Sequence, residues 1–287
     1  MVSVIICSAS AQQRERVCKN IAETIGVEHE FIIHDNTQED RLGICQAYNN
    51  CASKAKYECL CFVHEDVEFL SKGWGRELVL QANKDYTGVI GLAGGRVVTK
   101  TPLSWGEIGA PYIRVHIKHK KDWKFWNENP YNESFSEVIT LDGVMMFCKK
   151  SVWDRIRFND KVLKGFHCYD TDFSLRAAKY YKNYVCHTID LLHYSNGNFG
   201  KEWFEEIGRI YEPLKASLPM SVDKLSDEEM QKVIEKGDYE YIRRYIIKLK
   251  SRKEAIEAIR EFRHKYPGSS HSATLYAKFL AHKILWF

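Results

Sequence analysis

Hydrophobic residues in the first third of the chain follow two alternating patterns. Continuous apolar runs rich in β-branched residues, typical of strands buried on both faces, occupy residues 2–7, 30–36, 58–66 and 87–95. Segments with apolar residues at helical spacing lie between them, at residues 11–26, 42–56 and 73–85. This β-α-β-α-β-α-β order predicts an α/β fold with a mainly parallel sheet and right-handed crossover connections.

The pattern changes in the middle of the chain. Residues 97–136 carry many aromatic side chains without clear periodicity, which predicts a long functional loop. A strand is expected next, within residues 136–150, followed by a helix that begins at Ser151, where Asp154 supplies a capping-box-like start. A further helix is expected over residues 173–181, and one or two strands over residues 184–195.

Long helix formers dominate beyond about residue 205. Capping boxes of the S-x-x-E type predict helix starts at Ser226 and Ser251. The apolar stripe of a last helix is expected at Tyr276, Leu280 and Ile284. These patterns predict two domains, an α/β domain over residues 1–204 and a helical extension over residues 205–287.

The stripe on the last helix leaves several roles open. It fits packing against the α/β domain, packing in a homodimer, or peripheral contact with a membrane interface. A helix of this length is marginal alone in water, so something is expected to cover its apolar face. The weak positive charge of its polar face favours packing over contact with anionic lipid.

Composition narrows the function classes. The chain has 287 residues and a net charge of +4, without the basic, aromatic-interleaved stretches expected of a nucleic-acid partner. Its nine cysteines are scattered and form no C-x-x-C pair, which predicts reduced thiols in a cytosolic setting. The start of the chain lacks a charged leader, and no apolar run reaches the roughly 20 residues of a spanning helix. A cytoplasmic protein is therefore expected, either soluble or peripheral on the inner face of the membrane.

Polar residues follow each of the first three predicted strands. They are Ser8, then Asp35 and Asn36, then His64, Glu65 and Asp66. Ligands of open α/β sheets bind at the carboxyl ends of the strands, so these side chains are expected to converge on one crevice. The mixture of carboxylate oxygens and an imidazole nitrogen suits Mn²⁺ or Mg²⁺, whereas the alternative is a solvated turn.

The order of these motifs resembles the nucleotide-sugar half of family 2 glycosyltransferases with the GT-A fold. The matching segments are "VSVIICS", "EFIIHDNTQED" and "NNCASKAKYECLCFVHEDVEF", and the later "GFHCYDTDFSLRAAKYY" is similar to the acceptor half. The H-x-D-V at residues 64–67 and the F-H-x-Y-D-x-D that begins at Phe166 resemble a bacterial subgroup of glycosyltransferase-like proteins. The resemblance covers about residues 2–200.

The resemblance implies roles for particular residues. It places the metal ligands at His64, Asp66 and His193, and the catalytic base at Asp170. It places Asp35 at the nucleobase of the donor, and Asp142 and Gly143 at the acceptor or donor-sugar pocket. Ser8, Asn36 and Glu65 at the strand ends, and Arg96, are expected to contact the donor as well. Trp105 and Asp172 are expected at the acceptor or sugar pocket. The implied partners are a nucleoside diphosphate sugar and a glycan or lipid-linked acceptor, with Mn²⁺ or Mg²⁺ as cofactor.

Two departures from the family pattern bear on activity. His64 stands where the metal-binding D-x-D has its first Asp, and Tyr169 stands where Glu is common. The resemblance implies a metal-dependent, inverting glycosyltransferase of bacterial surface-glycan synthesis. The departures leave open the alternative of a catalytically silent module that binds nucleotide sugars or partner enzymes.

Several of these residues also have simpler interpretations. Asp172 fits a helix cap or a partner of Arg176 four residues on. Gly94, Gly95 and Arg96 fit a turn after the fourth strand, with Arg96 as an alternative contact for a diphosphate. The tryptophans of the aromatic segment fit either stacking on sugar rings or a small core of the loop itself. They are Trp105, Trp123 and Trp126.

Overall fold

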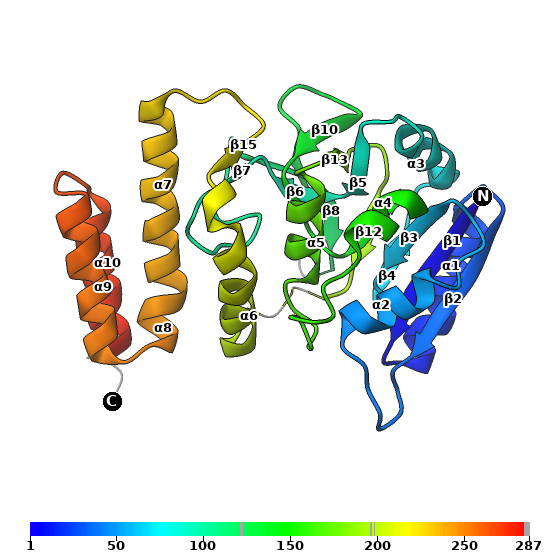
Figure 1. Cartoon of the computed structure of the whole chain (residues 1–287), viewed down its shortest axis with the longest axis horizontal. Coiled ribbons are helices and arrows are strands. Elements are labelled where there is room, and N and C mark those ends of the chain that lie inside the picture. Colours follow the sequence, from blue (N-terminus) through cyan, green and yellow to red (C-terminus); the bar gives the residue numbers. More distant parts are fainter. Residues whose placement is uncertain (121–122, 196, 198, 284–287) are drawn as a thin grey trace.

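The computed structural model describes residues 1–120, 123–195, 197 and 199–283. Its centre is a seven-stranded mixed sheet (Figure 1) in the order β10-β13-β5-β12-β3-β1-β2. These strands are β1 (Val2–Ser8), β2 (His29–Asp35), β3 (Cys59–Val63), β5 (Thr87–Gly91), β10 (Phe135–Val138), β12 (Met145–Lys149) and β13 (Lys182–Cys186). β1 pairs in parallel with β2 and β3, as the alternation of strands and helices predicts.

The sheet is mixed, as the resemblance to the GT-A fold implies. β12 lies between β3 and β5 and is antiparallel to both. β10 is antiparallel to β13, whereas β13 and β5 are parallel. The position of β12 between β3 and β5 has no local signature, because β12 lies more than fifty residues further along the chain.

A second sheet packs beside the first one. Its strands follow the order β11-β6-β8-β14-β4, and β9 pairs with β8. They are β4 (Val67–Phe69), β6 (Ala93–Gly95), β8 (Ile113–His119), β9 (Phe125–Glu128), β11 (Thr140–Leu141) and β14 (Leu191–His193). A small third sheet pairs β7 (Val97–Val98) with β15 (Met220–Ser221).

Helices and the second sheet cover the two faces of the main sheet. The side chains of β1 alternate, so that Ile5 faces one core while Val4 and Ile6 face the other. The first core contains residues of α2 (Ile44–Ala52), α4 (Lys150–Ile156) and α5 (Tyr169–Ala177). The second core contains residues of α1 (Ala11–Thr24), α3 (Trp74–Ala82) and the second sheet.

The chain crosses between the two sheets several times, and three of the short crossings lie together. It passes from β3 to β4 through residues 64–66, from β5 to β6 through Leu92, and from β11 to β12 through residues 142–144. Backbone hydrogen bonds join these crossings, from His64 N to Val144 O at 3.1 Å and from Asp142 N to Ala93 O at 2.8 Å. The three crossings therefore form one hydrogen-bonded seam between the sheets.

Three local predictions from the sequence are wrong. Gly94 and Gly95 form strand β6 instead of a turn, and a Cβ at Gly94 would overlap the carbonyl oxygen of Thr140 on the neighbouring strand. Helix α4 begins at Lys150 with Lys149 as N-cap, so Ser151 is not a cap. The segment expected to be one irregular loop contains β7 to β9 and the start of β10.

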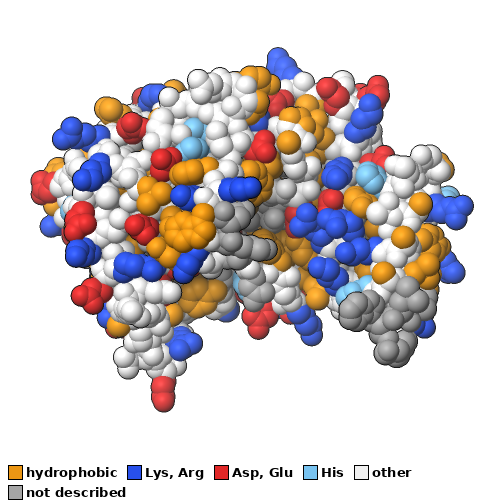
Figure 2. Space-filling view, turned by 180° about the vertical axis from the view of Figure 1, so that it is seen from behind, with side chains coloured by type: hydrophobic (Ala, Val, Ile, Leu, Met, Phe, Trp, Pro, Cys, Tyr) orange, Lys and Arg blue, Asp and Glu red, His pale blue; other side chains and the backbone are white. Residues whose placement is uncertain are grey.

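The C-terminal part is helical, as predicted, and lies at the opposite end of the molecule from β1 and β2 (Figure 1). It contains α6 (Lys201–Tyr211), a 3₁₀ turn (Glu212–Ser217), α7 (Asp227–Tyr241), a π-helical turn η2 (Ile242–Ile246), α8 (Ile247–Leu249), α9 (Arg252–Lys265) and α10 (His271–Lys283). The capping boxes at Ser226 and Ser251 are confirmed. From behind, a hollow separates these helices from part of the α/β region (Figure 2).

Two hydrophobic cores hold the C-terminal helices. Trp203, Ile207 and Tyr245 belong to the core that covers the main sheet, whereas Phe262 and Phe279 belong to a separate core. The division into residues 1–204 and 205–287 stays a proposal. No helix among the described residues has the length and apolar character needed to cross a membrane.

The predicted stripe of the last helix is wrong by one position. In α10, Leu275 and Phe279 are buried, whereas Tyr276 and Leu280 are 37% and 46% exposed. Ile284 lies outside the described residues. The buried pair packs in the separate C-terminal core, so intramolecular packing covers one face of this helix.

We expect Phe279→Ala to destabilise the C-terminal helices by about 3 kcal/mol, because truncating a buried Phe loses its apolar contacts and leaves a cavity. Leu280→Ala, one residue further on and on the exposed side, should change stability by less than about 0.5 kcal/mol. Urea unfolding of both variants, monitored by hydrogen exchange of the C-terminal helices, measures the difference in their stability. Equal losses would show that α10 does not pack through this face.

Candidate functional site

The polar residues that follow the first strands meet at the seam, and Glu65 ties two of the strand ends together. The carboxylate of Glu65 accepts hydrogen bonds from Ser8 Oγ at 2.7 Å, Ala9 N at 3.0 Å and Ser10 N at 3.2 Å. The end of β3 is thereby fixed against the end of β1 and the start of α1. This bracing leaves the neighbouring His64 and Asp66 in a defined position.

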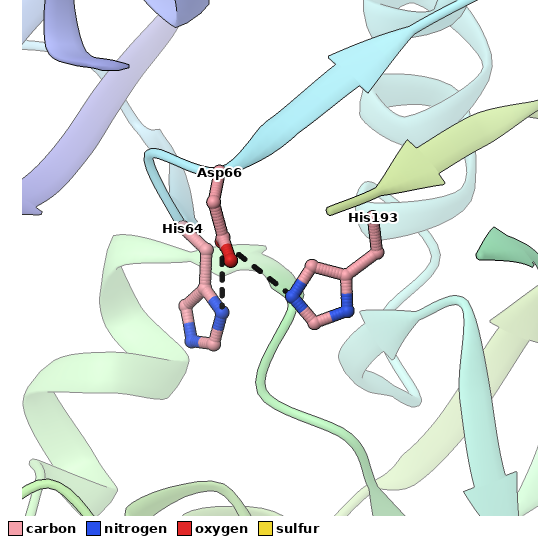
Figure 3. Close-up of side chains that lie close together, drawn as sticks. All are labelled: His64, Asp66 and His193. Atoms are coloured by element: carbon pink, nitrogen blue, oxygen red, sulfur yellow. Dashed lines mark ion pairs between the residues drawn. The ribbon is translucent and has the colours of Figure 1, made fainter. Parts of the chain in front are cut away.

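Three side chains around this turn form a group that could hold a metal ion (Figure 3). β14 runs antiparallel to β4 and places His193 opposite Val67, next to Asp66. His193 Nε2 lies 3.5 Å and His64 Nδ1 3.8 Å from Asp66 Oδ1. A metal–ligand distance of about 2.1 Å separates neighbouring ligands by about 3 Å and opposite ones by about 4.2 Å, which brackets both distances.

The hydroxyl of Tyr169 fixes the tautomer of His64. It donates to the carbonyl oxygen of Gly143 at 2.9 Å, and a carbonyl oxygen only accepts. The same hydroxyl lies 2.6 Å from His64 Nε2, so it must accept a proton from that nitrogen. His64 Nδ1 then carries a lone pair on the side of Asp66. Metal-binding histidines commonly donate their second N–H in this way.

Gly143 is required for this contact. A Cβ at Gly143 would overlap the hydroxyl of Tyr169. The two departures from the family pattern, His64 and Tyr169, are thus bonded partners, and Gly143 makes room for them.

The pKa shifts of Asp66 and His64 favour the protonation states that bind a cation. Burial would raise the pKa of Asp66, but the contacts with His193 and the charge of His64 outweigh it and hold that pKa well below its usual range. Burial and the neighbouring His193 lower the pKa of His64, against the charges of Asp66 and Asp142. Asp66 is therefore a carboxylate and His64 a neutral imidazole at neutral pH, which are the forms that bind metals.

A cavity of about 390 Å³ adjoins the group, within the range of about 300–1,000 Å³ typical of small-molecule sites. Of the predicted site residues, it is lined by His64, Trp105, Asp142, Gly143, Asp170 and His193. Helix α5 begins directly after Cys168 and supplies Asp170 in its first turn. The backbone φ of Cys168 is 60°, which is uncommon for a residue other than glycine. The backbone at the start of α5 therefore aims Tyr169 at His64 and Asp170 at the cavity.

The two carboxylates of the cavity have different surroundings. Burial, and then the charge of Asp142, raise the pKa of Asp170 to about 7. Asp170 Oδ1 accepts from Thr171 N at 2.7 Å, and the backbone N–H of Gly143 also contributes a hydrogen bond to this carboxylate. Both oxygens of Asp142 are engaged, Oδ1 by Val144 N and Oδ2 by the indole N–H of Trp105, each at 2.9 Å. Asp142 is therefore held on both oxygens, whereas Asp170 is the carboxylate of the cavity with the raised pKa.

The tryptophans divide between the two interpretations. Trp105 and Trp126 line the cavity with ring centroids 5.6 Å apart. Trp123 is 57% exposed and contacts Lys118 instead. Trp105 and Trp126 are therefore placed to contact a ligand, and Trp123 is not among the residues that line the cavity.

The remaining predicted residues lie outside the cavity lining and have partners of their own. Ser8 and Glu65 bond each other, Asp35 pairs with Arg14 at 2.8 Å, and Asn36 bonds both backbone groups of Leu42. Arg96 is buried and pairs with Asp223. Asp172 is buried and pairs with Arg176 at 2.6 Å, as its simpler interpretation predicts. The donor and acceptor roles of these residues stay predictions.

Sequence reasoning missed several residues that line the cavity. They are Glu107, His119, Phe166, Phe199, Trp203 and Arg244. His119 lies beside His193 in paired strands, and its Nδ1 is buried without a hydrogen-bond partner within the described residues. A signal for β8 was present, since Ile113, Val115 and Ile117 alternate with polar residues. Nothing local in the sequence indicates that Arg244 reaches the same cavity.

Comparisons with known proteins agree with this geometry. A family model described as "Glycosyltransferase like family" matches residues 3–212. A search of curated proteins found no match. The subgroup suggested by the H-x-D-V motif stays a prediction.

Solved structures of several glycosyltransferases resemble the chain. S. aureus TarS 1–349 has a TM-score of 0.57 and 14% identity, covering 98% of this chain and 88% of that fragment. The mannosyltransferase PcManGT of Pyrobaculum calidifontis, solved with GDP-Man and Mn²⁺, has a TM-score of 0.54 and 14% identity, covering 98% of this chain and 79% of its own. GalNAc-T7, solved with UDP, GalNAc and Mn²⁺, has a TM-score of 0.54 and 12% identity, covering 99% of this chain and 58% of the GalNAc-T7 chain. At these identities the likeness establishes the GT-A fold.

We expect Tyr169→Phe to weaken Mn²⁺ binding by about 10- to 100-fold, because His64 loses the hydroxyl that fixes its tautomer. Isothermal titration with Mn²⁺ measures the change. Tyr211→Phe is the matched control, since it removes another buried tyrosine hydroxyl, which donates to Leu103 O away from the metal-binding group. An unchanged Mn²⁺ affinity in Tyr169→Phe would show that this hydroxyl does not position a metal ligand.

Proposed function

The chain belongs to this glycosyltransferase-like family, and on that premise we propose that it is a metal-dependent, inverting enzyme that transfers a sugar from a nucleoside diphosphate sugar to an acceptor hydroxyl. The observation that carries the proposal is the placement of Asp170 on the same cavity as His64 and His193, which with Asp66 form the metal-binding group. A cation site for a diphosphate and a carboxylate for a hydroxyl proton are the two elements that such a transfer needs.

The chemistry of the ligands indicates which ion fits. His64, Asp66 and His193 offer two imidazole nitrogens and one carboxylate. Mg²⁺ prefers oxygen ligands, so this set favours Mn²⁺. When bound, the ion would neutralise negative charge on the diphosphate as it leaves. The Mn²⁺ complexes of PcManGT and GalNAc-T7 support this assignment.

Asp170 acts as the general base in this proposal. Its carboxylate accepts the proton of the acceptor hydroxyl while the hydroxyl oxygen attacks the anomeric carbon. The bond from the anomeric carbon to the diphosphate oxygen breaks, and the nucleoside diphosphate leaves with the electron pair. A carboxyl with a pKa of about 7 is well matched to this task, because about half of it is deprotonated at neutral pH and the carboxylate is a competent base.

The state of Asp142 favours inversion at the anomeric carbon. A retaining double displacement needs a second carboxylate as nucleophile. Both oxygens of Asp142 are held by hydrogen bonds from Trp105 and Val144, so this residue positions the aromatic wall instead. A single displacement assisted by Asp170 follows.

Trp105 and Trp126 are proposed to contact the transferred or accepting sugar, because the apolar C–H faces of sugar rings suit aromatic surfaces. On the donor side, Asp35 is proposed to contact the nucleobase, beside the strand ends that carry Ser8, Asn36 and Glu65. A glycan or lipid-linked acceptor and a cytoplasmic role in bacterial surface-glycan synthesis complete the proposal.

The most direct test is nucleotide binding. Thermal shift with UDP and GDP should raise the melting temperature in the presence of Mn²⁺, and much less in EDTA, because a ligand that binds the native state stabilises it. Asp66→Asn should abolish the Mn²⁺-dependent part of the shift. Asp154→Asn, an exposed carboxylate paired with Arg157 on α4, is the control and should behave as the wild type. Unchanged metal dependence in Asp66→Asn would place the metal site elsewhere.

Asp170→Asn should lower kcat by about 10²- to 10⁴-fold with nearly unchanged UDP binding, because the amide cannot accept the proton. In the wild type, kcat/KM should rise with pH as Asp170 deprotonates and level off above neutral pH. Bound Mn²⁺ adds positive charge and should move this midpoint lower. A pH profile of the two proteins measures both effects, and a wild-type profile that is flat between pH 5 and 8 would argue against Asp170 as the base.

Stability separates this effect from unfolding. Because its pKa is raised, native Asp170 holds its proton more tightly than the unfolded chain does, so stability falls as pH rises from about 4 to about 7 and stays lower above that. Asp170→Asn removes this effect. Its melting temperature at pH 8 should equal or exceed that of the wild type.

A further inference from the structure

The cavity has a second wall that the C-terminal helices help to build. The cavity is lined by residues of the metal-binding group and Asp170, and also by Phe199, Trp203 and Arg244. Among the described residues that line it, Arg244 is the one that comes from beyond residue 204. The helical part of the chain therefore contributes a cation to the cavity in which the transfer is proposed to occur.

The backbone that carries Arg244 is held firmly. Arg244 lies in the π-helical turn η2. π-Helical turns are rare in proteins, and those that occur often lie at functional sites. The next residue, Tyr245, is buried and stacks on Trp203 with ring centroids 5.0 Å apart. Its hydroxyl donates to the buried carboxylate of Glu107 from the α/β part. These contacts fix η2 against the cavity wall.

Positive charge around Arg244 exceeds the negative charge that faces it. Glu240 is buried and accepts from Arg244 Nε at 2.8 Å, from Arg243 Nε at 3.0 Å, and lies 3.3 Å from Lys236 Nζ. Three cations thus share one carboxylate. With Glu107 counted as ionised, these five groups carry a net charge of +1. In Figure 2, Lys and Arg side chains gather on the side of the C-terminal helices that borders the hollow.

Arg244 also has unused hydrogen-bonding capacity. Its side chain is 45% exposed, and within the described residues only Nε is engaged, by Glu240. Glu107 accepts from Tyr245 and from Ser104 N, and among the described residues it makes no hydrogen bond with Arg244. The terminal nitrogens of a guanidinium form a planar fork that binds phosphate or carboxylate through two bonds.

We propose that Arg244 binds an anionic group, a phosphate or a carboxylate, on the acceptor substrate. The assignment to the acceptor rests on the proposed function, in which the diphosphate of the donor lies at the group formed by His64, Asp66 and His193. Arg244 comes from the part of the cavity lining that the C-terminal helices contribute, where the excess positive charge lies. The class of acceptor is then an anionic glycan, polyol or lipid-linked molecule, and a neutral sugar lacks the group that Arg244 binds.

Inorganic phosphate tests the subsite directly, without nucleotide or metal. Calorimetric titration of the wild type with inorganic phosphate, at low ionic strength and in EDTA, should show binding. Arg244→Gln should weaken it at least about tenfold, the loss expected for a charge-assisted hydrogen bond. Arg244→Lys keeps the charge without the fork and should lie between the two. Arg263→Gln, which removes an exposed cation at the end of α9, is the control and should bind as the wild type.

Saturation with UDP and Mn²⁺ then distinguishes the acceptor from the donor. Phosphate that still binds to the loaded wild type, and depends on Arg244, supports the acceptor assignment. Displacement of phosphate by UDP, together with weaker UDP binding in Arg244→Gln, would assign Arg244 to the donor and overturn it. Equal phosphate affinity in Arg244→Gln and the wild type would also overturn it. If UDP does not bind with Mn²⁺ but phosphate binding depends on Arg244, the proposed function fails while the anion subsite stands.

Discussion

Two sheets made from one chain must be joined by short crossings, and in this protein the crossings are joined to each other. The turn of residues 64–66 and the turn of residues 142–144 each leave one sheet and enter the other, and the hydrogen bond from His64 N to Val144 O links them. Buried backbone groups at such crossings need partners, and here each crossing supplies the partner of the next. The seam therefore places His64, Asp66 and Asp142 side by side, and β14 and α5 bring His193 and Asp170 to it.

The sequence predicts the parts of this arrangement that depend on neighbouring residues. Buried strands, the capping boxes at Ser226 and Ser251, and the pairing of Asp172 with Arg176 follow from local spacing. Resemblance to known glycosyltransferases selected Asp66 and His193 as a pair, although 127 positions separate them, and the structure places them 3.5 Å apart. Pattern and resemblance therefore gave the fold and the position of the candidate metal-binding group.

Contacts between distant segments could not be predicted. His64 and Tyr169 are 105 residues apart, so their hydrogen bond has no local signature, and in the sequence each residue reads only as a departure from the family. The insertion of β12 between β3 and β5 is equally remote from any periodic pattern. Arg96 is another case: its place after a glycine pair suggests a ligand contact, and nothing local in the sequence indicates its buried pairing with Asp223. In each case the role of the residue or strand depends on a partner from a distant part of the chain, and only the folded structure shows that partner.

The fit of Tyr169 against Gly143 restricts how such a site can arise by mutation. Because any side chain at position 143 would occupy the space of the tyrosine hydroxyl, glycine has to be present before tyrosine can be accepted at position 169. Histidine at position 64 gains its oriented lone pair only once that tyrosine is in place. The three positions are therefore coupled, because a side chain at position 143 would displace the tyrosine hydroxyl and with it the group that orients His64.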